Sequence, residues 1–184
     1  MTTYGLIGYP LGHSFSRKFF TEKFEKEGTD AQYLNFEIPS IEEFPNIIKN
    51  SSTLRGLNVT IPYKQQVMQH LDEISKEAKA IGAVNVVKVS KEGLIGYNSD
   101  VIGFVNSIRP LLKPHHKKAL ILGTGGASKA IHYGLKEKLG METLFVSRTA
   151  RQGMITYEEV TTEVLKEYEV IVNCSPAGMF PHVD

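Results

Sequence analysis

The chain has 184 residues, 41% of them hydrophobic and 22% charged, so it is long and apolar enough to fold as one large or two small globular domains. Its 21 basic and 20 acidic residues nearly cancel, which disfavours nucleic acid as a partner. The first residues carry no basic lead and no sustained apolar run, so we expect a cytoplasmic protein without a membrane segment. A single cysteine and the lack of a metal-type His spacing exclude an internal disulfide and predict no metal.

Short β-rich runs alternate with amphipathic helices over the first hundred residues, a pattern typical of α/β layering. Strands are expected at 4–7, 33–38, 57–61, 83–89 and 93–97, and helices at 15–27, 41–50, 65–72 and 74–82. Four phenylalanines recur at helical spacing between Phe15 and Phe24, so we expect the first helix to bury one aromatic face. Ser14 is the expected N-cap of that helix.

A second pattern begins after the prolines at 110 and 114. A strand at 119–122 leads into a glycine-rich turn and a helix to about residue 139, and a strand at 142–147, a helix at 158–166 and a strand at 170–173 follow. This order predicts the first part of a Rossmann-type, doubly wound dinucleotide-binding domain. The fold class is therefore α/β, with a mostly parallel sheet in the first domain and the boundary between residues 100 and 101.

Glycines occupy positions 123, 125 and 126, between the predicted strand and helix. Without a Cβ, their backbone N–H groups can approach a pyrophosphate at the positive end of the helix. The third glycine of the usual fingerprint is replaced by Ser128, so the turn alone is about equally consistent with dinucleotide binding and with a purely structural role.

The end of the next strand carries Ser147, Arg148 and Thr149, followed by Arg151, where an NAD site usually has an acidic residue. A guanidinium group can bind the 2′-phosphate of NADP through two hydrogen bonds and stack on the adenine. The alternative is that both arginines only solvate a loop. Their position after the second strand favours NADP as the cofactor.

Polar residues follow apolar strands in three stretches of the first half: GYPLGHSFS at 8–16, NVTIPYK at 58–64, and GAVN at 82–85 with GYNSDVIGF at 96–104. In an open α/β sheet, ligands bind beyond the carboxyl ends of the strands. Together with GTGGAS at 123–128 and SRT at 147–149, in this order, these motifs resemble the shikimate dehydrogenase family over the whole chain.

The resemblance implies a substrate-binding catalytic domain at 1–100 and a partial NADP-binding domain at 101–184. It implies an enzyme that reduces 3-dehydroshikimate to shikimate with NADPH, in the pathway to chorismate and the aromatic amino acids. Lys64 would protonate the developing alkoxide, helped by Asp100, and Ser14 and Ser16 would bind the substrate carboxylate. Taken alone, Lys64 reads as a solvated lysine and Asp100 as a helix N-cap.

Further residues are implied by the same motifs. The ring hydroxyls of the substrate would be bound by Thr60 and Asn85, with Asn58 in support on the same strand as Thr60. The residues implied at the cofactor are Gly123, Gly125, Gly126, Ala127, Ser147, Arg148, Thr149 and Arg151. Asn173, Ser175 and Gly178 to Met179 would also lie near it, and a thiol function for Cys174 is not expected.

Two alternatives remain open at this stage. One is a quinate or quinate/shikimate dehydrogenase that uses NAD, and the other is a substrate-binding module without turnover. Methylenetetrahydrofolate dehydrogenases share the general architecture but not the paired serines or NVTIPYK. Because members of the family are longer, the resemblance also implies that this chain is truncated at its C-terminus, and it leaves a monomer and a homodimer equally open.

Overall fold

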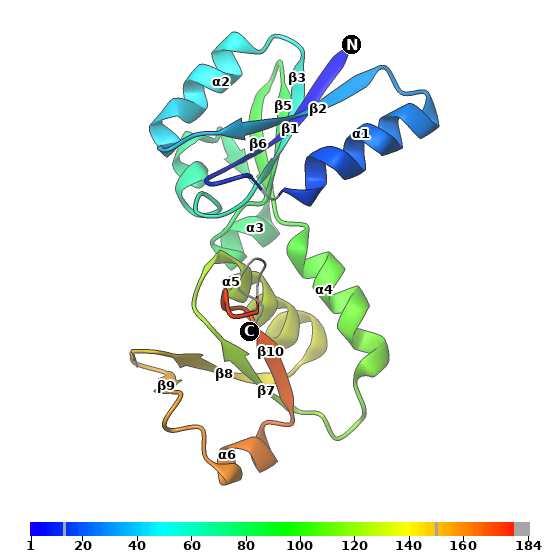
Figure 1. Ribbon diagram of the computed structural model, residues 1–184. Coiled ribbons are helices and arrows are strands. Elements are labelled where there is room, and N and C mark those ends of the chain that lie inside the picture. Colours follow the sequence, from blue (N-terminus) through cyan, green and yellow to red (C-terminus); the bar gives the residue numbers. More distant parts are fainter. Residues whose placement is uncertain (13, 150, 179–184) are drawn as a thin grey trace. The chain divides into compact units, whose positions relative to one another are not determined.

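The computed structural model describes residues 1–12, 14–149 and 151–178. The chain folds into two compact units, Met1–Asn98 and Ser99–Asp184, each with its own sheet (Figure 1). Both units combine a sheet with covering helices, which confirms the expected α/β class. In the part of the chain that the structure describes, no helix is both long and apolar enough to span a bilayer.

The first unit contains a six-stranded sheet in the order β2-β1-β3-β5-β6-β4. Its strands are β1 (Thr2–Gly8), β2 (Ala31–Glu37), β3 (Leu54–Val59), β4 (Glu73–Ile74), β5 (Val86–Ser90) and β6 (Gly93–Tyr97). The helices of this unit are α1 (Phe15–Glu27), η1 (Ile41–Glu43), α2 (Phe44–Asn50), η2 (Gln66–His70) and α3 (Lys76–Ile81). Strands β2, β1 and β3 are parallel, whereas β5 runs antiparallel to both β3 and β6.

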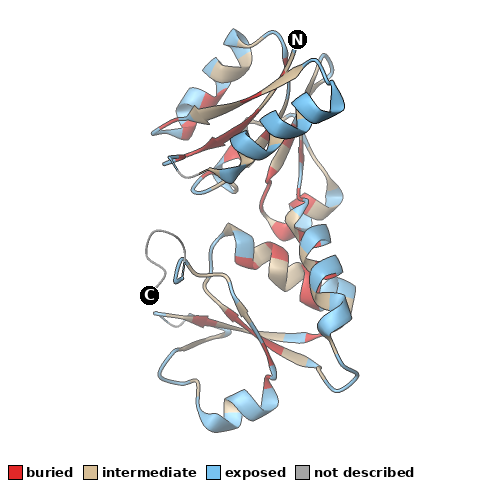
Figure 2. Ribbon diagram, turned by 45° about the vertical axis from the view of Figure 1, so that its right-hand side comes forward, coloured by how far each residue is buried: buried red, intermediate tan, exposed pale blue. Residues whose placement is uncertain are grey.

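Side chains that alternate along β1 build separate cores on the two faces of this sheet. Ile7 belongs to the larger core with Phe44 and Leu57, and Leu6 belongs to the core beneath α1. Figure 2 shows buried segments, in red, along the strands of this sheet. Such alternation follows from the two-residue period of a strand. With both faces covered, the strands are held in a fixed register, and so are the loops at their ends.

The aromatic face of α1 is only partly buried, which corrects the expectation from the sequence. Phe20 stacks on Tyr33 with 4.7 Å between ring centroids, and Phe24 lies 5.8 Å from the ring of Tyr4. Phe15 and Phe19, however, are 73% and 45% exposed. The sheet offers aromatic partners only to the second half of the helix, so the first turn stays in contact with solvent.

Two expected helices of this unit are also different in the structure. The helix expected at 65–72 is the short 3-10 helix η2, and the one expected at 74–82 is divided into strand β4 and helix α3. Ser75 caps α3, because its hydroxyl accepts the N–H of Ala78 at 3.2 Å. The capping serine, and not the apolar periodicity, therefore determines where α3 begins.

The second unit contains four parallel strands in the order β10-β7-β8-β9. Its strands are β7 (Lys118–Leu122), β8 (Glu142–Ser147), β9 (Met154–Thr156) and β10 (Val170–Asn173). Its helices are α4 (Asp100–Ile108), η3 (Arg109–Leu111), α5 (Gly126–Tyr133), η4 (Gly134–Lys138) and α6 (Thr162–Glu167). This is the 3-2-1-4 strand order of a doubly wound nucleotide-binding sheet, the type of fold that the sequence predicts. Strand β9 was not expected, and α6 is shorter than predicted.

Close helix packing in this unit depends on a glycine. A Cβ at Gly134 would lie 3.0 Å from Val105 Cγ2 and 3.3 Å from atoms of both Phe104 and Val101. The helical segment from α5 into η4 therefore packs directly against α4. Since α5 starts at the glycine turn, this contact helps to fix the direction in which its N-terminus points.

Candidate functional site

Three segments of the first unit meet at one edge of its sheet. Ile7 pairs with Val59 in the parallel β1 and β3 strands, and Asn58 pairs with Val86 in the antiparallel β5 strand. The carboxyl ends of β1 and β3 and the amino end of β5 therefore lie side by side at one end of the strands, which we call the polar edge of this sheet. The six substrate residues expected in this unit lie on or next to these segments: Ser14, Ser16, Asn58, Thr60, Lys64 and Asn85.

Tyr33 links two of these residues that come from different elements. Its hydroxyl donates a hydrogen bond to Asn58 Oδ1 at 2.8 Å, and the Ser16 side chain hydrogen bonds to the same hydroxyl. Burial raises the pKa of Tyr33 to about 12, with the Ser16 bond opposing the shift, so the hydroxyl remains a proton donor at neutral pH. This role was not predicted from the sequence, although a buried tyrosine next to a polar strand end requires a partner for its hydroxyl.

Ser14 does not cap α1, although it occupies the N-cap position. Its backbone has the extended conformation of an N-cap, with φ −67° and ψ 117°, but the side chain makes no capping hydrogen bond. The hydroxyl oxygen is buried and has no hydrogen-bond partner among the described residues. A buried polar atom without a partner costs about 1–3 kcal/mol, so Ser14 Oγ has a strong energetic reason to bind a ligand.

A pocket of about 530 Å³ opens beside Ser14. It is lined by Leu11, Gly12, Ser14, Arg17, Lys18, Thr21, Glu22 and Asn35. Asn35 Oδ1 is a second buried oxygen without a partner among the described residues. Of the six expected substrate residues only Ser14 lines this pocket, so it does not by itself mark the reaction site.

The backbone around Lys64 is held in place on both sides. The hydroxyl of Tyr63, which is 3% exposed, donates to the Ile38 carbonyl at 2.6 Å. The Lys64 carbonyl accepts the Val84 N–H at 2.7 Å, and the Thr60 N–H donates to the Ile7 carbonyl at 2.9 Å. The half-buried Lys64 side chain therefore extends from a fixed base at the polar edge.

Asn85 is held in the same way from the other side of the edge. Its N–H donates to the Tyr97 carbonyl at 3.0 Å, and its carbonyl accepts the Val59 N–H at 2.8 Å. Asn98, which is 4% exposed, donates from Nδ2 to the Ala83 carbonyl at 3.0 Å. Asn98 therefore positions the segment before Asn85, a supporting role that was not predicted from the sequence.

The glycine turn of the second unit follows β7, at the point where the strand order reverses. Gly123 has φ +101°, and a Cβ there would lie 3.1 Å from the carbonyl oxygen of Cys174. Gly125 is the N-cap of α5, and a Cβ there would meet no atom within 4 Å. Ser128 is completely buried, and its Oγ donates to the Gly125 carbonyl at 2.7 Å. Ser128 thus closes the turn where the usual fingerprint has its third glycine.

The end of α5 is suited to an anion. No side chain of the described residues caps it, so the first backbone N–H groups and the positive end of the helix face the open side of Gly125. Ala127, in the first turn, is exposed. An uncapped helix end at a topological switch point is where doubly wound sheets bind a pyrophosphate.

The predicted 2′-phosphate residues lie at the end of the neighbouring strand. Leu122 pairs with Val146, so Ser147 at the end of β8 lies on the same edge as the glycine turn. Arg148, Thr149 and Arg151 are exposed, and neither arginine forms an ion pair with any described residue. No carboxylate of the described residues therefore competes with an incoming phosphate for these guanidinium groups.

Asp100 and Cys174, which the sequence also singles out, lie in this unit. Asp100 is the first residue of α4 and follows Ser99 at the N-cap position, so it is not itself the N-cap. Asp100 and Lys64 belong to different units, and their cooperation stays a prediction. Burial raises the pKa of the Cys174 thiol to about 11, which makes it a poor nucleophile at neutral pH. Met179 lies outside the described residues.

Known proteins resemble this chain in sequence and in fold. A model of the shikimate dehydrogenase substrate binding domain matches residues 6–87. A curated shikimate dehydrogenase (NADP(+)) from Caldicellulosiruptor saccharolyticus is 35% identical over 97% of this chain and 70% of its own length. The crystal structure of shikimate dehydrogenase 1 from Peptoclostridium difficile is 36% identical, with a TM-score of 0.81 over 100% of this chain and 70% of that one.

A third relative is a crystal structure of shikimate 5-dehydrogenase from Thermus thermophilus, in complex with NADP(H) and shikimate. It is 31% identical to this chain, with a TM-score of 0.82 over 97% of this chain and 70% of that one. Sequence, fold and the polar edge of the first sheet therefore lead to one conclusion: the chain belongs to the shikimate dehydrogenase family.

Proposed function

We propose that this chain binds shikimate and 3-dehydroshikimate at the polar edge of the first sheet and NADP at the glycine turn of the second, and that it interconverts the two acids. The observation that carries this proposal is the convergence of the carboxyl ends of β1 and β3 with the amino end of β5. That register supports a common site for Ser14, Lys64 and Asn85, which come from segments far apart in the sequence. The relative from Thermus thermophilus, whose structure contains both ligands, supports it.

Ser14 and Ser16 are proposed to bind the carboxylate of the substrate. Both stand at the positive end of α1, which favours an anion, and Ser14 Oγ is buried without a partner among the described residues. Tyr33 would hold Ser16 and Asn58 in a fixed relation, because its hydroxyl bonds to both. The amide and hydroxyl groups of Asn58, Thr60 and Asn85 would then distinguish the stereochemistry of the ring hydroxyls.

Lys64 is proposed to transfer the proton. NADPH, when bound, supplies the hydride that adds to the keto carbon of 3-dehydroshikimate. The electron pair of the carbonyl π bond moves to the oxygen, and the Lys64 ammonium protonates that oxygen to give the alcohol. Asp100 would orient the lysine and pass it a replacement proton. In the opposite direction, neutral Lys64 accepts the hydroxyl proton of shikimate.

The residues of the second unit fit NADP. Gly125 leaves open space before an uncapped helix end, and Ser147 and Thr149 carry hydroxyl donors beside it. Arg148 and Arg151 carry charges that no described residue pairs, and these can bind a 2′-phosphate. Gly123, Gly126 and Ala127 would line the pyrophosphate through their backbone. We accordingly assign residues 1–100 to substrate binding and catalysis and residues 101–184 to the cofactor.

The relatives also guide the wider expectations. Since this chain spans 70% of the length of the Caldicellulosiruptor enzyme, we expect the longer relatives to carry further substrate and cofactor contacts. We expect a cytoplasmic enzyme of the shikimate pathway that acts on small molecules. An NAD-dependent quinate/shikimate dehydrogenase is the nearest alternative, and a binding module without turnover is the second.

One assay tests the function and separates these alternatives. Shikimate and quinate are each offered with NADP⁺ or NAD⁺, the reduced cofactor is followed by its absorbance, and the Caldicellulosiruptor enzyme serves as the positive control. We expect shikimate-dependent reduction of NADP⁺, and loss of turnover without loss of NADP binding in Lys64→Ala. Equal rates with NAD⁺ favour the quinate alternative. An active Lys64→Ala variant removes the proposed role of that lysine.

A further inference from the structure

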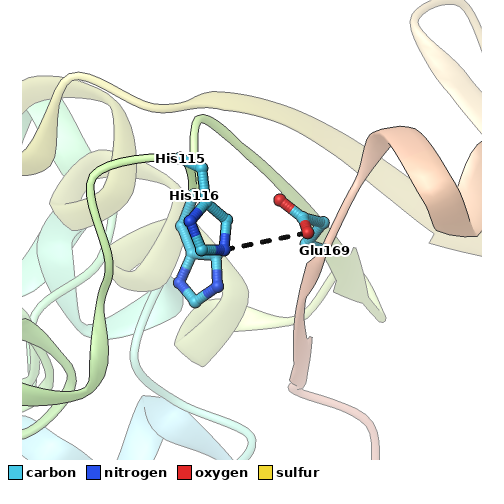
Figure 3. Close-up of side chains that lie close together, drawn as sticks. All are labelled: His115, His116 and Glu169. Carbon is cyan, nitrogen blue, oxygen red and sulfur yellow. Dashed lines mark ion pairs between the residues drawn. The ribbon is translucent and has the colours of Figure 1, made fainter.

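Two histidines and a glutamate gather on the second unit, away from its residues proposed to bind the cofactor. His115 and His116 precede β7, and Glu169 directly precedes β10. One potential ligand atom from each residue lies within 4.8 Å of the other two (Figure 3). The sequence predicted no metal, because the two histidines lie more than fifty residues from Glu169 and only the parallel pairing of β7 and β10 brings them together.

We propose that His115, His116 and Glu169 form a surface site for a divalent transition-metal ion such as Zn²⁺ or Ni²⁺, which ties the entry of β7 to the entry of β10. Two imidazoles and one carboxylate are the donor set that such ions prefer, whereas Ca²⁺ and Mg²⁺ prefer oxygen atoms alone. Three protein ligands leave a further coordination position for water.

The geometry requires only small side-chain movements. With metal–ligand bonds of about 2.1 Å, two ligands of a tetrahedral ion lie roughly 3.4 Å apart. His115 Nε2 and Glu169 Oε1 are 3.9 Å apart, and the two imidazole rings are 4.5 Å apart between centroids. The side chains of His115 and Glu169 are 57% and 46% exposed, so both can rotate toward a common point without disturbing the core.

Glu169 is the carboxylate available as a ligand, because the neighbouring acidic side chains Glu142 and Glu167 pair with Lys118. Lys118 Nζ lies 3.2 Å from Glu142 and 2.5 Å from Glu167, so both of those carboxylates already bind a cation. One interaction limits the affinity: His116 Nδ1 accepts the Lys113 N–H at 3.1 Å. If the ion binds His116 through Nδ1, it displaces the hydrogen bond from Lys113. If it binds through Nε2, the proton of the neutral ring lies on Nδ1, which can then no longer accept that hydrogen bond. We therefore expect micromolar rather than tighter binding.

The proposed metal site lies at the opposite end of strand β7 from the glycine turn proposed to bind the cofactor. Val170 pairs with Ala119, so the three ligands lie at the amino ends of β7 and β10, whereas Gly123 follows the carboxyl end of β7. At about 3.3 Å per residue, the strand β7 alone keeps the ion more than roughly 10 Å from the glycine turn. The expected effect of the ion is a link between two segments, independent of whether the protein is a dehydrogenase.

The test is calorimetric titration of Zn²⁺ and Ni²⁺ into chelator-treated protein from which any affinity tag has been removed. We expect one ion per chain, a dissociation constant weakened roughly ten-fold or more in His115→Ala, His116→Ala and Glu169→Gln, and a melting temperature raised by metal only when all three residues are present. Glu167→Gln is the matched control, since it removes the same charge two residues away and should retain binding.

Two further variants keep the result decisive. Cys174→Ser and His182→Ala each remove another potential metal ligand, and binding should persist in both. Cobalt(II) provides a spectroscopic check, because its visible absorption reports coordination by nitrogen and oxygen without a thiolate band. Equal affinity in His115→Ala and the unmodified chain, or binding that disappears with Cys174 or His182, would overturn the proposal.

Discussion

Replacing Gly123 with alanine should destabilise the second unit. The residue has φ +101°, and the new methyl group would lie 3.1 Å from the Cys174 carbonyl oxygen and 3.2 Å from the Ser175 nitrogen. A positive φ costs an L-residue about 1–2 kcal/mol, and pressing a methyl group against backbone atoms costs about 1–3 kcal/mol more. We therefore expect a loss of about 2–5 kcal/mol in the free energy of unfolding.

Gly125→Ala is the matched control, because it adds the same methyl group two residues later. Gly125 has φ −76° and no atom within 4 Å of the added Cβ, so the fold can accept alanine there. Alanine is a poorer N-cap but restricts the unfolded chain, and these effects should offset to within about 1 kcal/mol. The methyl group would instead occupy the space proposed for the pyrophosphate and weaken NADPH binding by roughly ten-fold or more.

Urea denaturation followed by circular dichroism measures the first effect, and calorimetric titration with NADPH measures the second. We expect the two variants to differ. Gly123→Ala should lose stability, whereas Gly125→Ala should lose affinity for NADPH while keeping its stability. A Gly123→Ala protein as stable as the unmodified chain would refute the packing argument. A Gly125→Ala protein that binds NADPH normally would refute the placement of the cofactor.

Three further predictions concern individual side chains. Arg148→Ser should weaken NADPH binding by about 1–3 kcal/mol and leave NADH binding unchanged. Calorimetric titration with both cofactors measures this, and equal losses of affinity for NADPH and NADH would exclude a 2′-phosphate contact. Tyr33→Phe should raise the KM for shikimate several-fold with little change in kcat, because it releases Ser16 and Asn58 without touching the reacting atoms; unchanged steady-state kinetics would contradict this. Burial raises the pKa of Tyr33 above its unfolded value of 10 to about 12, so its contribution to stability should be complete below pH 10 and fall by about 2 kcal/mol toward pH 12. Denaturation between pH 9 and about pH 11.5 should show a smaller loss in Tyr33→Phe, and equal losses in both proteins would refute it.

The strands were easier to predict than the short helices and the smallest strands. The strand expected at 142–147 coincides with β8, because its apolar residues form an uninterrupted β-rich run. Strand β9 has three residues and pairs only with β8, so its local sequence carries too little signal. The segment at 65–72 has helical periodicity but forms only the short η2, whose register the tertiary contacts of Val67 and Tyr63 set.

The candidate site residues could be predicted from sequence motifs, but the residues that position them could not. Ser14, Lys64 and Asn85 stand at strand ends that the sequence already marks as polar. The partners of Tyr33 and Asn98 are 15 to 25 residues away in the sequence, so their roles appear only once the strands are paired. Ser128 shows the reverse case: it departs from the glycine fingerprint, yet its hydroxyl closes the same turn.

The most direct test of the account is the dissociation constant of shikimate for the unmodified chain and for Ser14→Ala, measured by calorimetry without cofactor. Ser14 Oγ is the buried hydroxyl without a described partner, so its removal should weaken binding roughly ten-fold while leaving the fold intact. Ser52→Ala, at an exposed serine of the same unit, should bind as the unmodified chain does. If Ser14→Ala binds shikimate as tightly as the unmodified chain, the polar edge of the first sheet is not the substrate site.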